Sequence, residues 1–145
     1  MANEHFYDVS VKWNTDRKGI MSSEVLPQKI EVATPPEFNG GMAGIWSPEH
    51  LLVAAVNSCL MTTFLAIAEN SKLEFKTFDS KATGKLEIVD GKYMISEVEL
   101  KPVVGIADES VKEKAERILQ KAEKACLISN SVKSTIIFSP EITIA

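Results

Sequence analysis

The sequence predicts an α+β fold built on a mainly antiparallel sheet. Segments that alternate between apolar and polar residues are grouped, in the order βββ-α-ββ-α-β, whereas parallel folds alternate single strands with helices. Asp90-Gly91 joins two of these segments and indicates a hairpin, because both central residues of a type I′ turn need positive φ. A chain of 145 residues is typical of one domain, so we expect a single domain over residues 1–145.

Three strands are expected before the first helix. Residues 6–13 alternate as a strand, and residues 14–19 form a polar turn. Two further strands are expected at residues 20–26 and 28–34, separated by Pro27, because proline lacks the N–H that pairs in a sheet. The prolines and glycines of residues 35–41 then predict an irregular loop.

The first helix has a well-marked start. Ser47 suits the N-cap, Pro48 the first turn, and Glu49 the positive end of the helix dipole. The helix should run to about Asn70 and is apolar nearly all round, which is typical of a helix with layers on several sides. Its apolar run approaches the length of a membrane span. Because hydroxyl and amide residues interrupt it, we expect a buried helix and no membrane partner.

The second half of the chain repeats the strand-to-helix order. Strands are expected at residues 75–89 and 92–104, on either side of the hairpin turn. Asp108 can cap a second helix, whose apolar residues recur at helical spacing over residues 111–125. Residues 134–144 form the expected closing strand, at a sheet edge because it contains Pro140.

Composition argues against several classes of function. A net charge of −4 and the lack of a basic cluster disfavour nucleic acid and anionic membrane surfaces. His5 and His50 are not spaced with the cysteines as metal ligands, and there is no phosphate loop or dinucleotide fingerprint. We therefore expect no metal and no cofactor. No secretory signal is visible at the N-terminus, so we expect a cytoplasmic protein.

The two cysteines are the strongest candidates for chemistry. Cys59 lies within the first helix and Cys126 at the end of the second. Free cysteine is among the most buried residue types, so one interpretation is that both are inert apolar residues. The alternative is a reactive pair, because structural disulfides are rare in cytosolic proteins. Polar neighbours, Asn57-Ser58 and Ser129-Asn130, can supply the donors that a reactive thiolate needs.

Arg17 and Glu49 are the candidate partners of a reactive thiol. Arg17 is either an exposed turn residue or a cation that lowers a thiol pKa and orients a peroxide. Glu49 either stabilises the helix start or holds Arg17 by an ion pair. Glu49 precedes Cys59 by ten residues, about 15 Å along a straight helix. If both residues are catalytic, either Glu49 serves the Cys59 of another subunit or the helix breaks between them.

Two motifs resemble the OsmC/Ohr family, the osmotically inducible and organic hydroperoxide resistance proteins. The segment Ser-Pro-Glu-His-Leu-Leu, leading into Ala-Ala-Val-Asn-Ser-Cys59, is similar to the family's Asn-Pro-Glu-(Gln/Glu)-Leu…Ala-Cys. The segment Cys126-Leu-Ile-Ser-Asn resembles its Cys-Pro-Val-Ser-Asn. The chain also matches the family in its length, in its order of elements and in the Ser22-Ser23-Glu24 segment after the first turn. The resemblance therefore covers essentially the whole chain.

The resemblance implies an intertwined homodimer, with sheet from both chains around two central helices and two active sites at the interface. It implies thiol-dependent reduction of organic hydroperoxides. Cys59 would be the peroxidatic thiolate, and Cys126 the resolving thiol that closes an intrasubunit disulfide. A dithiol, lipoyl-type in the Ohr branch, would reduce that disulfide. Arg17 and Glu49 would activate Cys59 and place the peroxide.

The chain departs from the family pattern at three places. Leu127 replaces the proline after the second cysteine, and His50 replaces the glutamine or glutamate. An ungapped match from Ser22-Ser23 puts Asp16 at the arginine position, with Arg17 one residue away. These differences indicate a divergent member. Two alternatives therefore stay open: a dimer that binds a small hydrophobic ligand with little peroxidase activity, and a structural dimer with inert cysteines.

Overall fold

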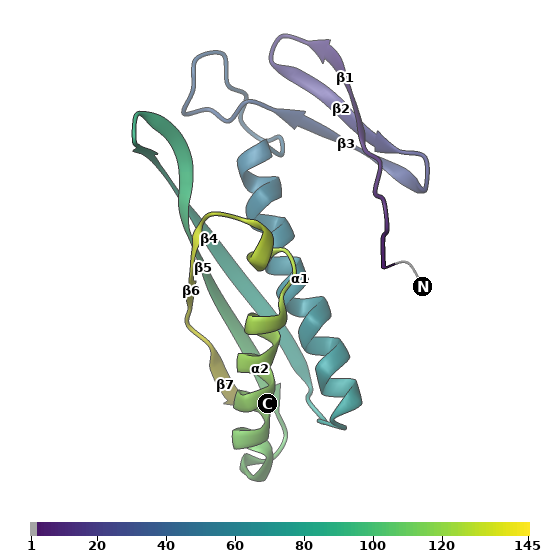
Figure 1. Cartoon of the computed structure of the whole chain (residues 1–145), viewed down its shortest axis with the longest axis vertical. Helices are drawn as coiled ribbons and strands as arrows, with labels where there is room; N and C mark the ends of the chain where they lie inside the picture. Colours follow the sequence, from purple (N-terminus) through teal and green to yellow (C-terminus); the bar gives the residue numbers. More distant parts are fainter. Residues whose placement is uncertain (1–2) are drawn as a thin grey trace. The chain divides into compact units, whose positions relative to one another are not determined.

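The computed structural model describes residues 3–145, and the α+β class is confirmed (Figure 1). The chain divides into two compact units, Met1–Leu51 and Leu52–Ala145. The first unit contains a three-stranded sheet, and the second contains a larger sheet and most of the helical residues. We describe each unit separately.

The first unit is an antiparallel sheet in the order β1-β2-β3, formed by β1 (Ser10–Thr15), β2 (Lys18–Ser23) and β3 (Leu26–Ala33). The first strand begins at Ser10, not at residue 6, because its pairing with β2 ends there, opposite Ser22. The connecting turn is shorter than residues 14–19. Thr15 already pairs with Lys18, and Asp16 takes a φ of 50°.

Pro27 does not separate two strands, contrary to the prediction. It lies inside β3, and the turn between β2 and β3 comes earlier, at residues 24–25. Two features make a proline tolerable there. β3 is an edge strand, and its register with β2 shifts between Met21 and Ser23.

The second unit contains β4 (Thr77–Val89) and β5 (Lys92–Ile106), an antiparallel hairpin. Its turn is the predicted Asp90-Gly91, with φ values of 50° and 78°. The predicted closing strand is two strands, β6 (Thr135–Phe138) and β7 (Glu141–Ile144). Both pair with β5 in parallel, because the chain returns to the sheet through a helical crossover.

Two helices belong to this part of the fold. Helix α1 is Pro48–Asn70, which begins in the first unit, and α2 is Lys112–Ala125. Asp108 caps a short 3₁₀ turn, Glu109–Val111, by accepting from the Ser110 N–H, and α2 follows that turn directly. Asp108 is therefore not the N-cap of α2 itself. A second 3₁₀ turn, Ser129–Ser131, follows α2.

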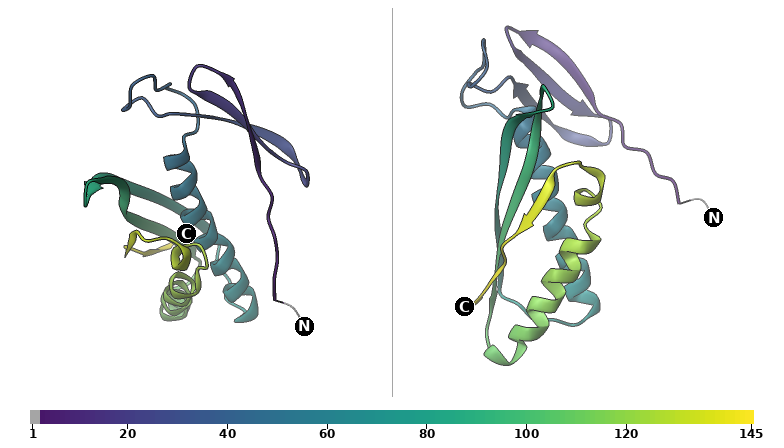
Figure 2. Two further views of the ribbon diagram at one scale, coloured as in Figure 1. Left: turned by 45° about the horizontal axis from the view of Figure 1, so that its top comes forward. Right: turned by 60° about the vertical axis from the view of Figure 1, so that its left-hand side comes forward.

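The core of the second unit lies between the two helices and one face of the sheet (Figure 2). Its fully buried side chains come from α1, β5 and α2: Val56, Leu60, Phe64, Val98, Leu100, Val104, Ile106, Ala115, Leu119 and Ala122. The members on α1 recur every four residues and so form one face.

Only that face of α1 is buried within the single chain. On the opposite side Met61 and Leu65 are 38% and 40% exposed, so the single chain supplies no layer over that side of α1. Among the described residues α1 is the one helix long and apolar enough to cross a membrane, a test that core helices of soluble proteins also pass.

Candidate active site

The fold brings the two cysteines together. Cys59 stands at the rim of the buried face of α1 and is 9% exposed. Cys126 follows the last residue of α2 and is fully buried, with its Sγ 4.0 Å from the backbone carbonyl of Val56, one turn before Cys59. The two thiols are free, and they lie within hydrogen-bond reach of each other.

The turn after Cys126 is held by its own hydrogen bonds. The Asn130 N–H donates to the carbonyl of Cys126 over 3.1 Å, and the Ser131 N–H donates to Ile128 over 2.9 Å. The Ser131 hydroxyl donates to the carbonyl of Leu127 over 2.8 Å. These bonds fix a tight turn directly after Cys126.

The surroundings of Cys59 favour its thiolate. Burial raises the pKa of this thiol, but several hydrogen bonds outweigh it and hold the pKa below its ordinary value. The donors are, in decreasing order of effect, the Ile128 amide, the Cys126 thiol, the Thr63 hydroxyl and the Leu127 amide. The Thr63 oxygen lies 3.8 Å from the sulfur, one turn further along α1.

The pKa of the Cys126 thiol is raised above its ordinary value. Burial raises its pKa, and the neighbouring Cys59 raises it further. The Ser129 hydroxyl and amide act in the opposite direction without reversing the result. That hydroxyl is buried and forms no hydrogen bond of regular geometry within the described residues. The pair is thus asymmetric, with Cys59 the more acidic thiol and Cys126 its protonated neighbour.

An arrangement of this kind suits thiol redox chemistry. A thiolate is the nucleophilic form of cysteine, and a second thiol within reach can condense with the oxidised first one. Sequence reasoning did not include Thr63 or the two amides in the site. Thr63 follows Cys59 by four residues, so helical spacing could have identified it, whereas no sequence pattern indicates which amides face a sulfur.

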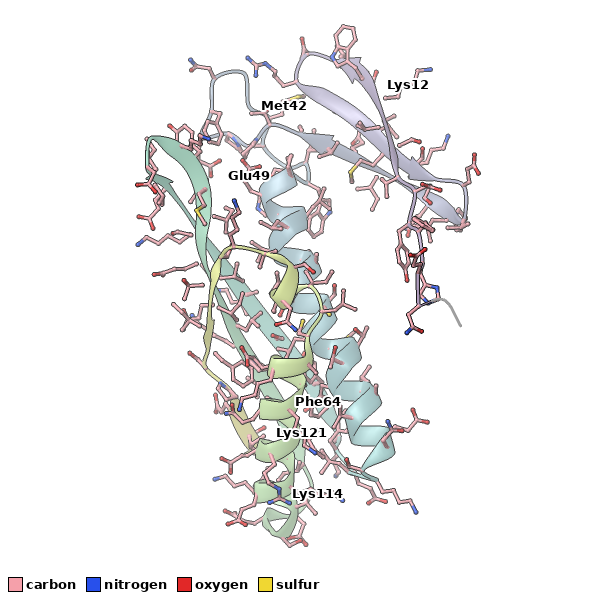
Figure 3. The ribbon with its side chains drawn as sticks, in the orientation of Figure 1. Lys12, Met42, Glu49, Phe64, Lys114 and Lys121 are labelled. Atoms are coloured by element: carbon pink, nitrogen blue, oxygen red, sulfur yellow. The ribbon has the colours of Figure 1, made fainter. Side chains whose placement is uncertain are left out.

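Arg17 and Glu49 both lie in the first unit, and they form no ion pair with each other within the described residues. Arg17 is exposed in the β1–β2 turn, with its side chain against Gly40. Glu49 stands in the first turn of α1 (Figure 3), and its Oε1 is buried without a hydrogen-bond partner. Helix α1 is continuous from Glu49 to Cys59, so their separation along it stays as predicted.

The start of α1 has the predicted cap. The Ser47 hydroxyl accepts from the His50 N–H over 3.1 Å and also contacts His50 Nδ1 over 2.7 Å. Ser47 is fully buried, and the His50 ring meets Trp46 edge-on. His50 is therefore a helix-end residue, and no group of three or more metal-ligating side chains occurs in residues 3–145.

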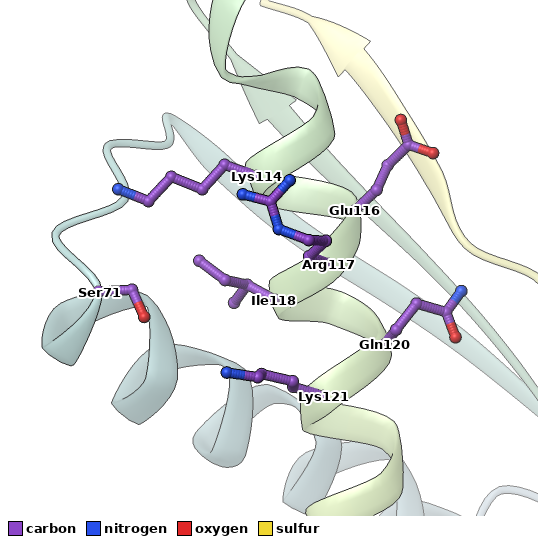
Figure 4. Close-up of a pocket in the computed structure, with 7 residues that line it drawn as sticks. All are labelled: Ser71, Lys114, Glu116, Arg117, Ile118, Gln120 and Lys121. Carbon is purple, nitrogen blue, oxygen red and sulfur yellow. The ribbon is translucent and has the colours of Figure 1, made fainter.

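A separate hollow of about 510 Å³ lies over α2, away from the cysteines. Lys114, Arg117 and Lys121 project along one side of the helix, opposite Ser71 at the end of α1 (Figure 4). None of the three cations forms an ion pair within the described part of the chain. Arg117 is thus an exposed surface residue and does not belong to the thiol pair.

Comparison with known proteins agrees with this fold. The chain is 24% identical over 139 residues to the uncharacterized protein YmaD of Bacillus subtilis (strain 168), covering 94% of this chain and 91% of that one. It superposes on an OsmC-like protein of unknown function from Vibrio cholerae with a TM-score of 0.83 at 22% identity, covering 94% and 99% of the two chains.

An organic hydroperoxide resistance protein from Elizabethkingia anophelis also shares the fold, with a TM-score of 0.74 at 19% identity and 100% of both chains covered. The sequence pattern of the OsmC-like protein family matches residues 41–141, which include both cysteines and Glu49. That match extends over more than half of the chain, and the chain therefore belongs to the OsmC-like protein family.

Proposed function

We propose that this protein is a thiol-dependent peroxidase that reduces organic hydroperoxides. The observation that carries the proposal is the asymmetric thiol pair, in which Cys59 has a lowered pKa beside the protonated Cys126. Membership of the OsmC-like family supports it, as does the shared fold of the hydroperoxide resistance protein.

The proposed reaction has three steps. The Cys59 thiolate attacks the distal peroxide oxygen, the O–O bond breaks, and the alkoxide leaves and takes up a proton, so that sulfur becomes a sulfenic acid and the peroxide an alcohol. The Cys126 thiol then attacks the sulfenic sulfur, forming a disulfide and releasing water. Finally a dithiol reductant, for which a lipoyl group is a candidate, exchanges with the disulfide and restores both thiols.

The proposal includes a homodimer in which the partner completes each site. Three observations support it. The apolar face of α1 is uncovered in the single chain, and every residue of β1 is exposed, including Val11 and Trp13. The buried Oε1 of Glu49 has no partner within the described residues, which is costly for a carboxylate. In the proposed dimer Arg17 and Glu49 activate a Cys59 thiolate and orient the peroxide.

A second candidate function is the binding of a small hydrophobic ligand. The same uncovered apolar face of α1 favours it, because such a surface can line a cavity between two chains. In that case Cys59 and Cys126 would take no part in the function. Free thiols also fit a reducing compartment, so we place the protein in the cytoplasm as part of the proposal.

Thiol counting separates the two functions. Reduced protein is mixed with cumene hydroperoxide, or with hydrogen peroxide at the same concentration, and the free thiols are counted over time. The proposal predicts rapid loss of both thiols with the organic peroxide, slower loss with hydrogen peroxide, and no reaction in Cys59→Ser. Cys126→Ser should accumulate a sulfenic acid that a dimedone-type reagent labels. Unchanged thiols under excess organic peroxide would reject peroxidase activity and leave the binding function.

A further inference from the structure

The charged residues of α2 are sorted by sign onto two sides of the helix. Successive cations are three or four residues apart, so they lie along one side of α2. We call these residues the cation stripe: Lys114, Arg117, Lys121 and Lys124. The acids of the same helix recur at offsets of three and seven residues and lie along another side: Glu113, Glu116 and Glu123. The sorting leaves one side of α2 positive.

The cation stripe stays positive in the folded protein. Like charges one turn apart repel each other on a helix, and none of the stripe side chains forms an ion pair within residues 3–145. The whole chain carries a net charge of −4, so the stripe reverses the sign locally. Lys114, Arg117 and Lys121 border the hollow of about 510 Å³ opposite Ser71, whereas the carboxylate of Glu116 points to the other side of the helix (Figure 4). Such a surface is complementary to an acidic partner.

The stripe leads toward the thiol pair. From Lys114 to Lys124 it covers ten residues of α2, which is about 15 Å along the helix axis. Helix α2 ends at Ala125 and Cys126 follows directly, so the last cation precedes the second thiol by two residues. Leu127, the next residue, is 65% exposed and adds an apolar contact surface after the thiol. A partner that lies along the stripe therefore extends to the turn that carries Cys126.

We propose that the cation stripe is the docking surface for an acidic protein that carries the dithiol reductant to the Cys59–Cys126 disulfide. The inference deepens the proposed function and rests on it, because that function requires a reductant to reach these two sulfurs. One thiolate of the carrier attacks a sulfur of the disulfide and forms a mixed disulfide, and the second thiol of the carrier then closes the carrier's own disulfide. The carrier loses two electrons and two protons, which restore Cys59 and Cys126 as thiols.

The length and charge of the stripe favour a protein over other anions. A single small anion contacts only part of a row of about 15 Å, whereas acidic side chains spread over a protein surface can face all of its cations. Nucleic acid is disfavoured, because the chain is acidic overall and α2 has no aromatic side chain on which a base could stack. Complementary charge acts mainly on the rate of encounter, so the docking should be visible in the rate of disulfide reduction.

The experiment measures disulfide reduction without any peroxide. Diamide first oxidises Cys59 and Cys126 to the disulfide, and mass spectrometry checks the bond. The reductants are a dihydrolipoyl-lysine peptide flanked by glutamates, the same peptide with glutamines, and free dihydrolipoamide as the reference for each protein. Counting the protein thiols over time gives the rates. The glutamate peptide should react about tenfold faster than the glutamine peptide at low salt, and this advantage should shrink as the ionic strength rises to about 0.5 M.

Reversing the charge of the stripe should remove the advantage of the glutamate peptide. The stripe variant is Lys114→Glu/Arg117→Glu/Lys121→Glu. The matched control reverses the same number of exposed cations just before or within β4 and β5, and so changes the net charge equally: Lys76→Glu/Lys81→Glu/Lys92→Glu. The control should keep most of the advantage, because its charges lie outside α2 and salt screens them from a peptide bound there.

Equal rates for the two peptides, or an equal loss of advantage in the stripe variant and the control, would overturn the inference. Fluorescence anisotropy of the labelled glutamate peptide with the reduced proteins is a second measurement that needs no disulfide. The stripe variant should bind this peptide about tenfold more weakly than the control, and equal binding would also overturn the inference. A single-stranded oligonucleotide that binds the stripe more tightly than the glutamate peptide would assign the surface to nucleic acid instead.

These measurements keep the docking surface separate from the proposed function. Because no peroxide is used, a docking advantage in a protein that never consumes peroxide would keep this inference and reject the peroxidase. A protein that consumes organic peroxide but treats both peptides alike would reject the docking surface and keep the peroxidase.

Discussion

The Thr63 hydroxyl offers a sharp test of how the protein stabilises the Cys59 thiolate. Thr63→Val removes the hydroxyl and keeps the shape of the side chain. A hydrogen bond to a charged group contributes about 1.5–3 kcal/mol. The separation of 3.8 Å is long, and two other donors act more strongly on the sulfur, so we expect about 1 kcal/mol.

One pKa unit corresponds to about 1.36 kcal/mol, so the pKa of Cys59 should rise by about 0.7 unit in Thr63→Val. Below that pKa the thiolate fraction, and with it the alkylation rate, should fall about fivefold. The pH dependence of iodoacetamide alkylation at Cys59 measures this change.

The adjacent threonine is the matched control. The Thr62 hydroxyl donates over 3.1 Å to the backbone carbonyl of Cys59 and not to its sulfur. Thr62→Val should therefore leave the alkylation profile of Cys59 unchanged. An unaltered profile in Thr63→Val, or an equal shift in the two variants, would refute the assignment of Thr63 as a thiolate donor.

Three further predictions concern stability, each checked by urea unfolding. Phe64→Ala should lower the free energy of unfolding by about 3–5 kcal/mol, because this side chain is fully buried; a loss below about 1 kcal/mol would contradict its core position. Asn57→Ala should cost about 1–3 kcal/mol, because Asn57 exchanges hydrogen bonds of 2.9 Å and 2.6 Å with Ser80 of β4; the exposed neighbour, in Ser58→Ala, should change stability by less than about 0.5 kcal/mol. The pKa of Cys59 is lower in the folded state than in the unfolded state, so the free energy of unfolding should rise as pH increases between these two pKa values and fall again as pH decreases through the folded-state pKa. The same pH slope in Cys59→Ser would exclude this linkage.

Strand boundaries show where local reasoning stops. The turn at Asp16-Arg17 and the strand through Pro27 were misplaced because a strand ends where its neighbour ends, and an edge strand tolerates a proline that a central strand does not. The closing segment breaks at Ser139-Pro140 into β6 and β7, whose parallel pairing depends on the crossover through α2. Each of these boundaries depends on how strands pair, which the residues of one strand do not specify.

The sequence alone determined the features that short-range physics controls. The cap at Ser47, the hairpin turn at Asp90-Gly91 and the spacing of the apolar residues in both helices depend on residues only a few positions apart. The same holds for Cys59 and Cys126 as the candidates for chemistry, since nucleophilicity belongs to the residue type.

The tertiary structure decided the rest. The packing of the end of α2 against α1 brings the two thiols together. It also produces the opposite shifts of their pKa values. Burial and hydrogen bonding act over a few ångströms of space, and the chain brings such neighbours together only when it is folded.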